Sequence, residues 1–143
     1  MERHREYTAQ RSYEYEVRNK AGVRISTETQ EEWKERVLNE WSVLGFDKMA
    51  MIFHEFDCLE NGKQKPLHVH GVFVFKEPMF KETALKLLNC SLPTNVSHIK
   101  NFTSACRYLT HITEQAIKDG KYIYSEGDVY TFNCTYNELI QKR

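Results

Sequence analysis

The first part of the chain carries the pattern of one strand followed by one long amphipathic helix. Apolar and polar residues alternate over residues 12–18, which predicts a half-buried strand there. Thr29 and Glu32 have the spacing of a capping box, and Gly45 stands where a helix would end. The apolar stripe of this predicted helix consists of Trp33, Val37, Leu38, Trp41 and Leu44.

Two apolar runs in the middle of the chain predict a β-hairpin. They cover residues 48–56 and 67–76 and are separated by Asn61, Gly62 and Pro66, residue types that favour turns. In the second run, alternate side chains point to opposite faces of a sheet, and both faces are largely apolar. This pattern indicates a central strand that is covered on both sides.

The rest of the chain predicts two helices with a short strand between them. The helices are expected over residues 80–89 and 104–119, the strand over residues 96–102, and Gly120 can close the last helix. Residues 121–143 give no firm pattern. The order strand, helix, strand, strand, helix, strand, with a further helix behind it, is that of the ferredoxin-like, split β-α-β sheets. We therefore expect an α+β fold in which helices cover one face of an antiparallel sheet.

Composition narrows the class of protein. A chain of 143 residues, 41% apolar and 13% aromatic, has the size and the core-forming residues of one domain, so we interpret residues 1–143 as a single domain. It shows no apolar stretch long enough to span a membrane and no secretory signal, and we expect a cytoplasmic protein. The four cysteines are scattered without a Cys-x-x-Cys pair, which argues against a zinc ribbon. Because 20 basic and 20 acidic residues cancel, a nucleic-acid partner would have to be held by local contacts.

The pair His68 and His70 is the strongest candidate for chemistry, because residues two apart on a strand point to the same side. His54 ends the preceding apolar run, and Asp57 follows it by three positions. A buried imidazole without a partner costs about 1 to 3 kcal/mol, so either a metal ion or local hydrogen bonds must satisfy these side chains. Four potential ligands at the ends of two neighbouring strands favour the metal. All four share one face only if the strand ends or bulges near residues 55–56.

The predicted helix over residues 104–119 carries Tyr108 on its polar edge, together with His111 and Gln115. Its apolar stripe consists of Ala105, Leu109, Ile112 and Ala116. From the polar edge, a phenol could reach the sheet face that carries the histidines. A tyrosine on a helix is usually a packing residue, and it is the neighbouring metal site that makes a nucleophilic role worth testing.

These residues form motifs that resemble those of a known enzyme superfamily. In chain order the motifs are His54-Glu55-Phe56-Asp57, His68-Val69-His70 and Arg107-Tyr108-Leu109-Thr110-His111. Together they resemble the three motifs of the HUH endonucleases and, more narrowly, the replication initiators of small rolling-circle plasmids of Gram-positive bacteria. The resemblance extends over residues 48–129. In viral members a lysine often follows the tyrosine by three or four residues, and His111 stands there in this chain, which favours the plasmid branch.

The resemblance implies the HUH endonuclease fold and a nicking reaction. In such a protein a tyrosine attacks one strand of the origin DNA, single-stranded at the nick, and leaves a 5′-phosphotyrosine link and a free 3′-OH. Carried over by position, Tyr108 would be the nucleophile, and the metal ligands would be His54, Asp57, His68 and His70. Three imidazoles and one carboxylate favour Mn²⁺, and Mg²⁺ is the alternative ion.

Further residues are candidates for supporting roles. His111, or as a weaker candidate Glu55, would orient or deprotonate the phenol. The candidate phosphate contacts are Lys63, Lys65, Arg107, Lys118 and Lys121. Tyr124 matches another tyrosine of the subfamily, and we expect it to pack or to contact DNA. Host replication proteins are the expected protein partners, and no membrane contact is expected.

Two other functions fit the same residues. One is a non-catalytic DNA-binding module in which the ion only stabilises the sheet. The other is a metal-dependent hydrolase that uses activated water, with Tyr108 in a purely structural role. The effect of replacing Tyr108 on DNA cleavage distinguishes the three functions.

Overall fold

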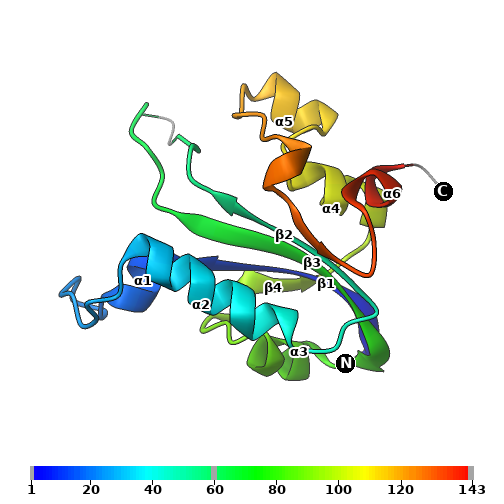
Figure 1. The fold of residues 1–143 in the computed structure, drawn as a ribbon, viewed down its shortest axis with the longest axis horizontal. Coiled ribbons are helices and arrows are strands. Elements are labelled where there is room, and N and C mark those ends of the chain that lie inside the picture. The colour runs from blue at the N-terminus through cyan, green and yellow to red at the C-terminus, as the bar shows by residue number, and fades with distance from the viewer. Residues whose placement is uncertain (1, 59–60, 142–143) are drawn as a thin grey trace.

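The computed structural model describes residues 2–58 and 61–141, and these build a five-stranded antiparallel sheet in the order β4-β1-β3-β2-β5 (Figure 1). The strands are β1 (His4–Ser12), β2 (Lys48–His54), β3 (His68–Met79), β4 (Val96–His98) and β5 (Tyr130–Phe132). The predicted antiparallel α+β class, the hairpin of β2 with β3 and the central place of β3 are confirmed.

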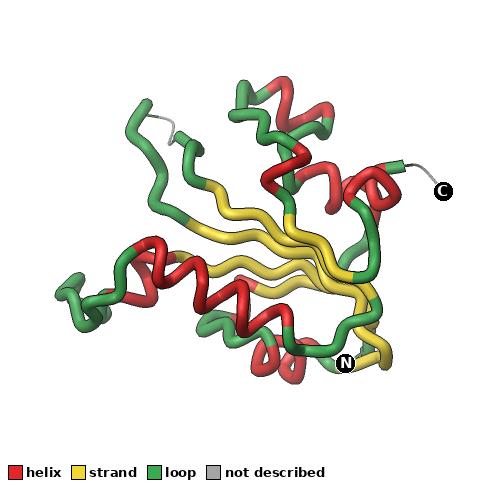
Figure 2. The backbone as a smooth tube through the Cα atoms, in the orientation of Figure 1, coloured by secondary structure: helices red, strands yellow, loops and turns green. Residues whose placement is uncertain are grey.

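Helices lie against the sheet as separate layers. The prediction that helices cover one face holds for α2 (Gln30–Ser42) and α3 (Lys81–Leu87), which lie together on that face (Figures 1 and 2). On the opposite face, α4 (Phe102–Tyr108) and α6 (Tyr136–Ile140) pack over β2 and the middle of β3. The other helical segments described are α1 (Tyr13–Val17), α5 (Glu114–Lys118) and the 3₁₀ turns η1 (Pro93–Asn95) and η2 (Glu126–Asp128). Among the described residues, no helix has the length and apolar character needed to cross a membrane.

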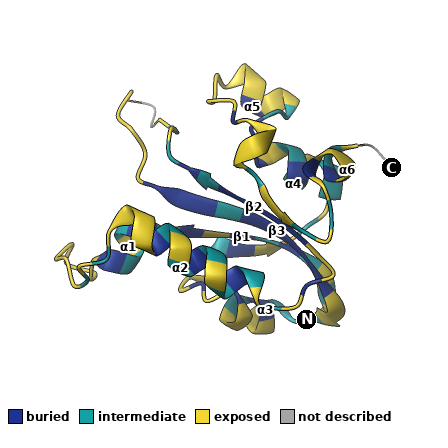
Figure 3. Ribbon diagram, in the orientation of Figure 1, coloured by how far each residue is buried: buried dark blue, intermediate teal, exposed yellow. Residues whose placement is uncertain are grey.

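The larger core lies between α2 and the sheet. The predicted capping box is present: Thr29 Oγ1 accepts a hydrogen bond from the backbone of Glu32, and the Glu32 carboxylate accepts one from the backbone of Thr29. The stripe behind it is buried on one side of the helix (Figure 3). Trp33 and Trp41 are fully buried, and the Trp41 ring meets the Phe73 ring of β3 edge-on, with centroids 4.9 Å apart. Burial of this stripe explains why the helix forms where the sequence predicts it.

The prediction of a strand over residues 12–18 is wrong, because β1 ends where that range begins and α1 follows it directly. Tyr13 and Val17 are both buried, and their spacing of four fits one side of a helical turn as well as it fits a strand. The helical turn also places the Glu16 carboxylate 2.8 Å from the guanidinium of Arg11, whose side chain is buried under α2. This buried ion pair needs the helical form.

The prediction of one helix over residues 104–119 is also wrong. α4 ends at Tyr108, α5 begins at Glu114, and His111 between them has a left-handed backbone with φ of 62°. Thr113 starts the new helix, because its side chain accepts a hydrogen bond from the backbone of α5. Of the predicted stripe, Leu109 and Ala116 are buried and Ala105 and Ile112 are half-buried.

Two other elements are shorter than predicted. α3 falls inside the range 80–89, and β4 covers only the first part of the range 96–102. The strand stops early because the Asn101 side chain caps α4, where it accepts a hydrogen bond of 3.0 Å from the backbone of Ser104.

A second core lies between the sheet and the C-terminal helices. Its buried members are Ala50, Ile52, Val72, Cys106, Leu109, Tyr124, Tyr136 and Leu139. The Tyr136 hydroxyl of α6 lies 2.7 Å from Thr110 Oγ1 and donates to the Cys106 carbonyl at 2.8 Å. These bonds fix the end of α4, and with it the backbone of Tyr108.

We expect Gly71→Ala to destabilise the fold. Gly71 lies in β3, and a Cβ built there would sit 2.5 Å from Cζ of Phe73 and 3.0 Å from Cζ3 of Trp41. The clash should lower the free energy of unfolding by about 1–3 kcal/mol, as measured by urea denaturation. The control is Gly127→Ala, where the nearest atom is 3.6 Å away. Equal unfolding midpoints for the two variants would contradict this packing.

Candidate metal centre

The end of β2 brings the predicted ligands to one place. β2 stops at His54, directly opposite His68 of β3, and the chain then leaves the sheet. Because the strand ends there, the side chain of Asp57 no longer follows the alternation of side chains between the two faces of the sheet. It lies on the same face as His54 and His68. The predicted end of the strand near residues 55–56 is therefore confirmed.

Three ligand atoms converge at this point. His54 Nδ1 lies 3.3 Å from His68 Nε2, and Asp57 Oδ2 lies 3.4 Å from the first and 3.2 Å from the second. Atoms bound tetrahedrally to a metal at about 2.0–2.2 Å lie about 3.3–3.6 Å from one another. The spacing of the three atoms therefore fits a shared metal ion.

Backbone carbonyls hold both imidazoles in the orientation that a metal requires. His54 Nε2 lies 2.7 Å from the Leu109 carbonyl, and His68 Nδ1 lies 2.9 Å from the Pro66 carbonyl. A carbonyl oxygen only accepts hydrogen bonds, so each of these nitrogens must carry the hydrogen. In the neutral rings, the other nitrogens then direct their lone pairs at Asp57.

Two more histidines complete overlapping groups of possible ligands. His70 groups with His54 and His68, and His111 groups with His54 and Asp57, with all ligand atoms of each group within 4.8 Å of one another. His111 Nδ1 donates to the Tyr122 carbonyl at 2.7 Å, because that carbonyl only accepts. Sequence reasoning missed His111 as a candidate ligand, since only the left-handed backbone at this residue turns its ring toward the site.

The electrostatics of the group favour metal-binding protonation states. Burial opposes a charge on Asp57, but its close contacts with His54 and His68 and the hydrogen bond from Tyr124 outweigh burial and lower the pKa of Asp57. Burial, which opposes a charge on the ring, lowers the pKa of His70. A charged carboxylate next to a neutral imidazole is the state that coordinates a metal ion.

Tyr124 holds the acidic ligand in place. Its ring stacks on His54 with centroids 4.5 Å apart, and its hydroxyl donates to Asp57 Oδ1 at 2.7 Å and accepts from the Phe56 backbone at 3.0 Å. Burial and the hydrogen bond to Asp57 raise the pKa of Tyr124. A buried phenol with a raised pKa is a poor nucleophile, so its position supports a packing and orienting role.

Tyr108 lies beside the ligands and is open to solvent. It is the last residue of α4, its side chain is 37% exposed, and its ring centroid is 6.3 Å from that of His70 and 5.1 Å from that of His111. Tyr108 and His70 line a groove of about 290 Å³ on the uncovered part of the histidine face. We call this groove the Tyr108 groove. Of the two tyrosines, Tyr108 is the one that a substrate can reach.

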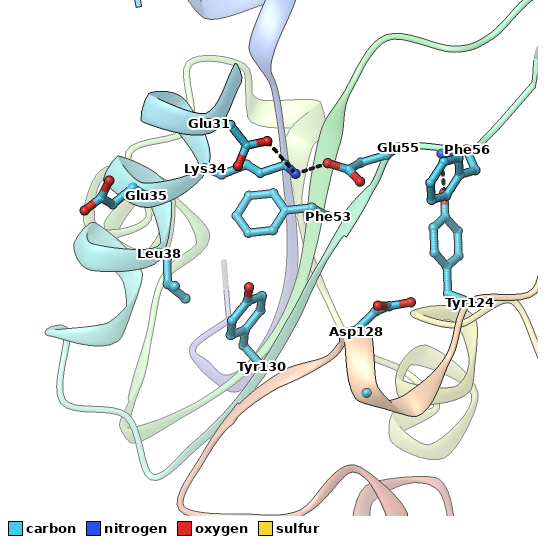
Figure 4. A pocket seen from close by; sticks show the side chains of 11 residues that line it. Glu31, Lys34, Glu35, Leu38, Phe53, Glu55, Phe56, Tyr124, Asp128 and Tyr130 are labelled. Atoms are coloured by element: carbon cyan, nitrogen blue, oxygen red, sulfur yellow. Dashed lines mark hydrogen bonds and ion pairs between the residues drawn. The ribbon is translucent and has the colours of Figure 1, made fainter. Parts of the chain in front are cut away.

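Glu55 does not join this group. Its carboxylate forms an ion pair with the Lys34 ammonium of α2, in a different pocket (Figure 4). The interpretation of Glu55 as a base for Tyr108 is therefore wrong. The reason is strand alternation: Glu55 follows His54 immediately, so the two side chains leave the strand on opposite sides.

A family comparison agrees with the motifs. The family model described as "plasmid replication protein, origin binding domain" matches residues 8–137. The chain belongs to this family. The resemblance to plasmid replication initiators is thereby confirmed, and binding of origin DNA is the function that defines the domain. A comparison with curated proteins found no match.

The candidate DNA contacts of this origin-binding domain differ in whether their charged groups are exposed or already bound within the protein. Lys63, Lys65, Lys118 and Lys121 are exposed. Arg107, by contrast, uses Nε to donate to the Ile140 carbonyl at 2.9 Å, so part of its guanidinium is bound to α6. Lys65 lies beside His68, and Lys121 lines a pocket that also contains Asp57. Their roles as phosphate contacts stay predictions.

We expect Tyr124→Phe to weaken metal binding without unfolding the domain. The variant keeps the ring that stacks on His54 but removes the hydroxyl that holds Asp57. Loss of such an outer contact should raise the Kd for Mn²⁺ by about 10–100-fold, as measured by isothermal titration calorimetry. The control is Tyr122→Phe at a half-exposed neighbouring tyrosine. An unchanged Kd in Tyr124→Phe would show that Asp57 needs no such support.

Proposed function

We propose that this origin-binding domain nicks one strand of plasmid origin DNA through attack by Tyr108, as the initiating step of rolling-circle replication. The observation that carries the proposal is the convergence of His54 Nδ1, His68 Nε2 and Asp57 Oδ2 within 3.2–3.4 Å of one another, close to an exposed tyrosine. Metal ligands next to a reachable phenol are what phosphodiester transesterification requires.

The donor set fits a divalent ion held by His54, Asp57, His68 and His70. When bound, such an ion polarises the scissile phosphate and offsets the negative charge that develops on its oxygens. Three imidazoles and one carboxylate favour Mn²⁺, while Mg²⁺ prefers more oxygen ligands and is the alternative.

Tyr108 supplies the nucleophile. Its hydroxyl oxygen forms a bond to phosphorus, the bond from phosphorus to the 3′ oxygen breaks, and the 3′ oxygen leaves and takes up a proton. The products are a 5′-phosphotyrosine and a free 3′-OH that a host polymerase can extend. Because the phosphodiester energy is kept in the tyrosine link, the reverse reaction can rejoin the strand without another energy source.

His111 is the group best placed to take the phenol proton. Its ring lies edge-on to that of Tyr108, with centroids 5.1 Å apart. The hydrogen bond from Nδ1 to the Tyr122 carbonyl leaves Nε2 as the nitrogen that can accept a proton. Burial lowers the pKa of His111, which keeps the ring neutral, as a base must be, at neutral pH.

We expect Tyr108→Phe to abolish nicking while metal binding survives. The phenylalanine keeps the packing of α4 but lacks the attacking oxygen. Cleavage of single-stranded origin oligonucleotides should fall by about 1,000-fold or more, and the covalent DNA adduct seen by denaturing electrophoresis should disappear. Cleavage that persists in this variant would favour attack by activated water. An unmodified domain that cleaves no oligonucleotide with Mn²⁺ would favour the non-catalytic DNA-binding module.

We expect His68→Ala to weaken metal binding and nicking together. The change removes a ligand atom that lies 3.2 Å from Asp57 Oδ2. The Kd for Mn²⁺ should rise by about 10-fold or more, and the nicking rate at limiting Mn²⁺ should fall in parallel. The control is His98→Ala in β4, where the ring stacks on His4 at 4.1 Å, away from the site. Unchanged metal content in His68→Ala by elemental analysis would rule out this ligand assignment.

A further inference from the structure

We propose that a pocket beside His68 binds one base of the nicked strand, and that this contact contributes to the choice of the nicking sequence. The proposal rests on the proposed function. The pocket has a volume of about 210 Å³, and the residues that matter for the argument are Gln10, Tyr15, Lys65, Ser91 and Asn95. We call it the base pocket.

The base pocket exists because β4 is short. β4 pairs only with Tyr7–Ala9 of β1, so the edge of β1 beyond Ala9 has no strand beside it. On its other side the same part of β1 pairs with β3, where Gln10 is opposite His70 and Ser12 is opposite His68. The pocket therefore lies next to the proposed metal ligands, and His68 is one of its lining residues.

The lining of the base pocket suits a neutral, flat ligand with hydrogen-bonding edges. Gln10, Ser91 and Asn95 offer amide and hydroxyl groups, and side-chain amides pair with the edges of bases. The Tyr15 ring, 52% exposed, offers a surface on which a base can stack. A volume of about 210 Å³ equals the space of about seven water molecules, enough for a single base.

The only cation that faces the pocket with free charge among the described lining residues is Lys65. Arg11 also lines the pocket, but its guanidinium is already paired with Glu16 at 2.8 Å and with Glu40 at 2.9 Å. Lys65 is exposed at the rim, and its backbone donates to the Asp57 carbonyl at 2.7 Å, which fixes it next to the metal ligands. A lysine in this place suits the phosphate that flanks a bound base.

The base pocket lies next to the Tyr108 groove. Gln10 and Asn95 line both, so a strand whose phosphate lies at Tyr108 can place a nearby base in the pocket. The pocket between α2 and β2 is a contrasting case, because its lining has four acidic residues, Glu31, Glu35, Glu55 and Asp128, against one cation, Lys34, so its net charge is negative (Figure 4). Its charge would repel a DNA backbone, which leaves the base pocket as the better site for the strand.

The test combines variants of the pocket with removal of single bases from the DNA. The probe is a single-stranded oligonucleotide that the unmodified domain nicks with Mn²⁺, and a set of copies that each carry an abasic site at one position near the nick. Nicking rates are measured for the unmodified domain, Gln10→Ala, Tyr15→Ala and the control Tyr130→Ala. Tyr130 is 48% exposed, similar to Tyr15, and lies on β5 at the opposite edge of the sheet.

We expect one position at which loss of the base slows nicking by the unmodified domain by about 10-fold or more. Gln10→Ala and Tyr15→Ala should nick the intact oligonucleotide more slowly than the unmodified domain. Removing the base at that position should then slow these variants little further, because the base and the side chain act through one contact. Tyr130→Ala should keep the full response, and the Kd for Mn²⁺ should be unchanged in all three variants.

The outcomes separate the two proposals. If the unmodified domain nicks the oligonucleotide, and each abasic site changes the nicking rate of Gln10→Ala and Tyr15→Ala by the same factor as that of the unmodified domain, the base pocket is overturned. The proposed function is then unaffected. A domain that nicks no oligonucleotide, or a Tyr108→Phe variant that still nicks, overturns the proposed function and the base pocket with it.

Discussion

The hydrogen bond between His54 Nε2 and the Leu109 carbonyl, 2.7 Å long, joins the two halves of the site. On one side it determines which nitrogen of His54 faces His68 and Asp57. On the other side it holds the residue that directly follows Tyr108, and so fixes the end of α4 against the sheet. His54 is fully buried, so loss of this bond would cost about 1–3 kcal/mol as well as the orientation of the ring. One bond therefore couples ligand geometry to the position of the proposed nucleophile.

Elements with strong local signals were predictable, and those decided by contacts distant in sequence were not. The capping box and stripe of α2 and the two apolar runs of β2 and β3 specify these elements locally. Tyr13 and Val17 fit a strand and a helix equally, and the buried pairing of Arg11 with Glu16 decides for the helix. The break between α4 and α5 depends on the left-handed backbone of His111. Glycine is the residue that usually signals such a conformation, and here the position is a histidine.

The sequence spacing was enough to place the proposed ligands together, but it did not predict the hydrogen bonds that orient them. Alternation on β3 and the end of β2 were enough to place His54, His68 and Asp57 together. The carbonyls of Leu109 and Pro66 contribute only backbone atoms, which no residue pattern reveals. These carbonyls satisfy His54 Nε2 and His68 Nδ1, which explains how the two histidines are tolerated next to an apolar core. The roles of the ligands and of Tyr108 stay predictions.

The position of a bound ion would show directly whether His54, His68 and Asp57 share one metal. Crystals of the domain grown with Mn²⁺ give an anomalous signal that locates the metal without assumptions about the protein. We expect a single strong peak about 2.0–2.2 Å from His54 Nδ1, His68 Nε2 and Asp57 Oδ2, with His54 still bonded to the Leu109 carbonyl. A saturating Mn²⁺ concentration that leaves this position empty, or a His54 ring that has turned away from Leu109, would contradict it.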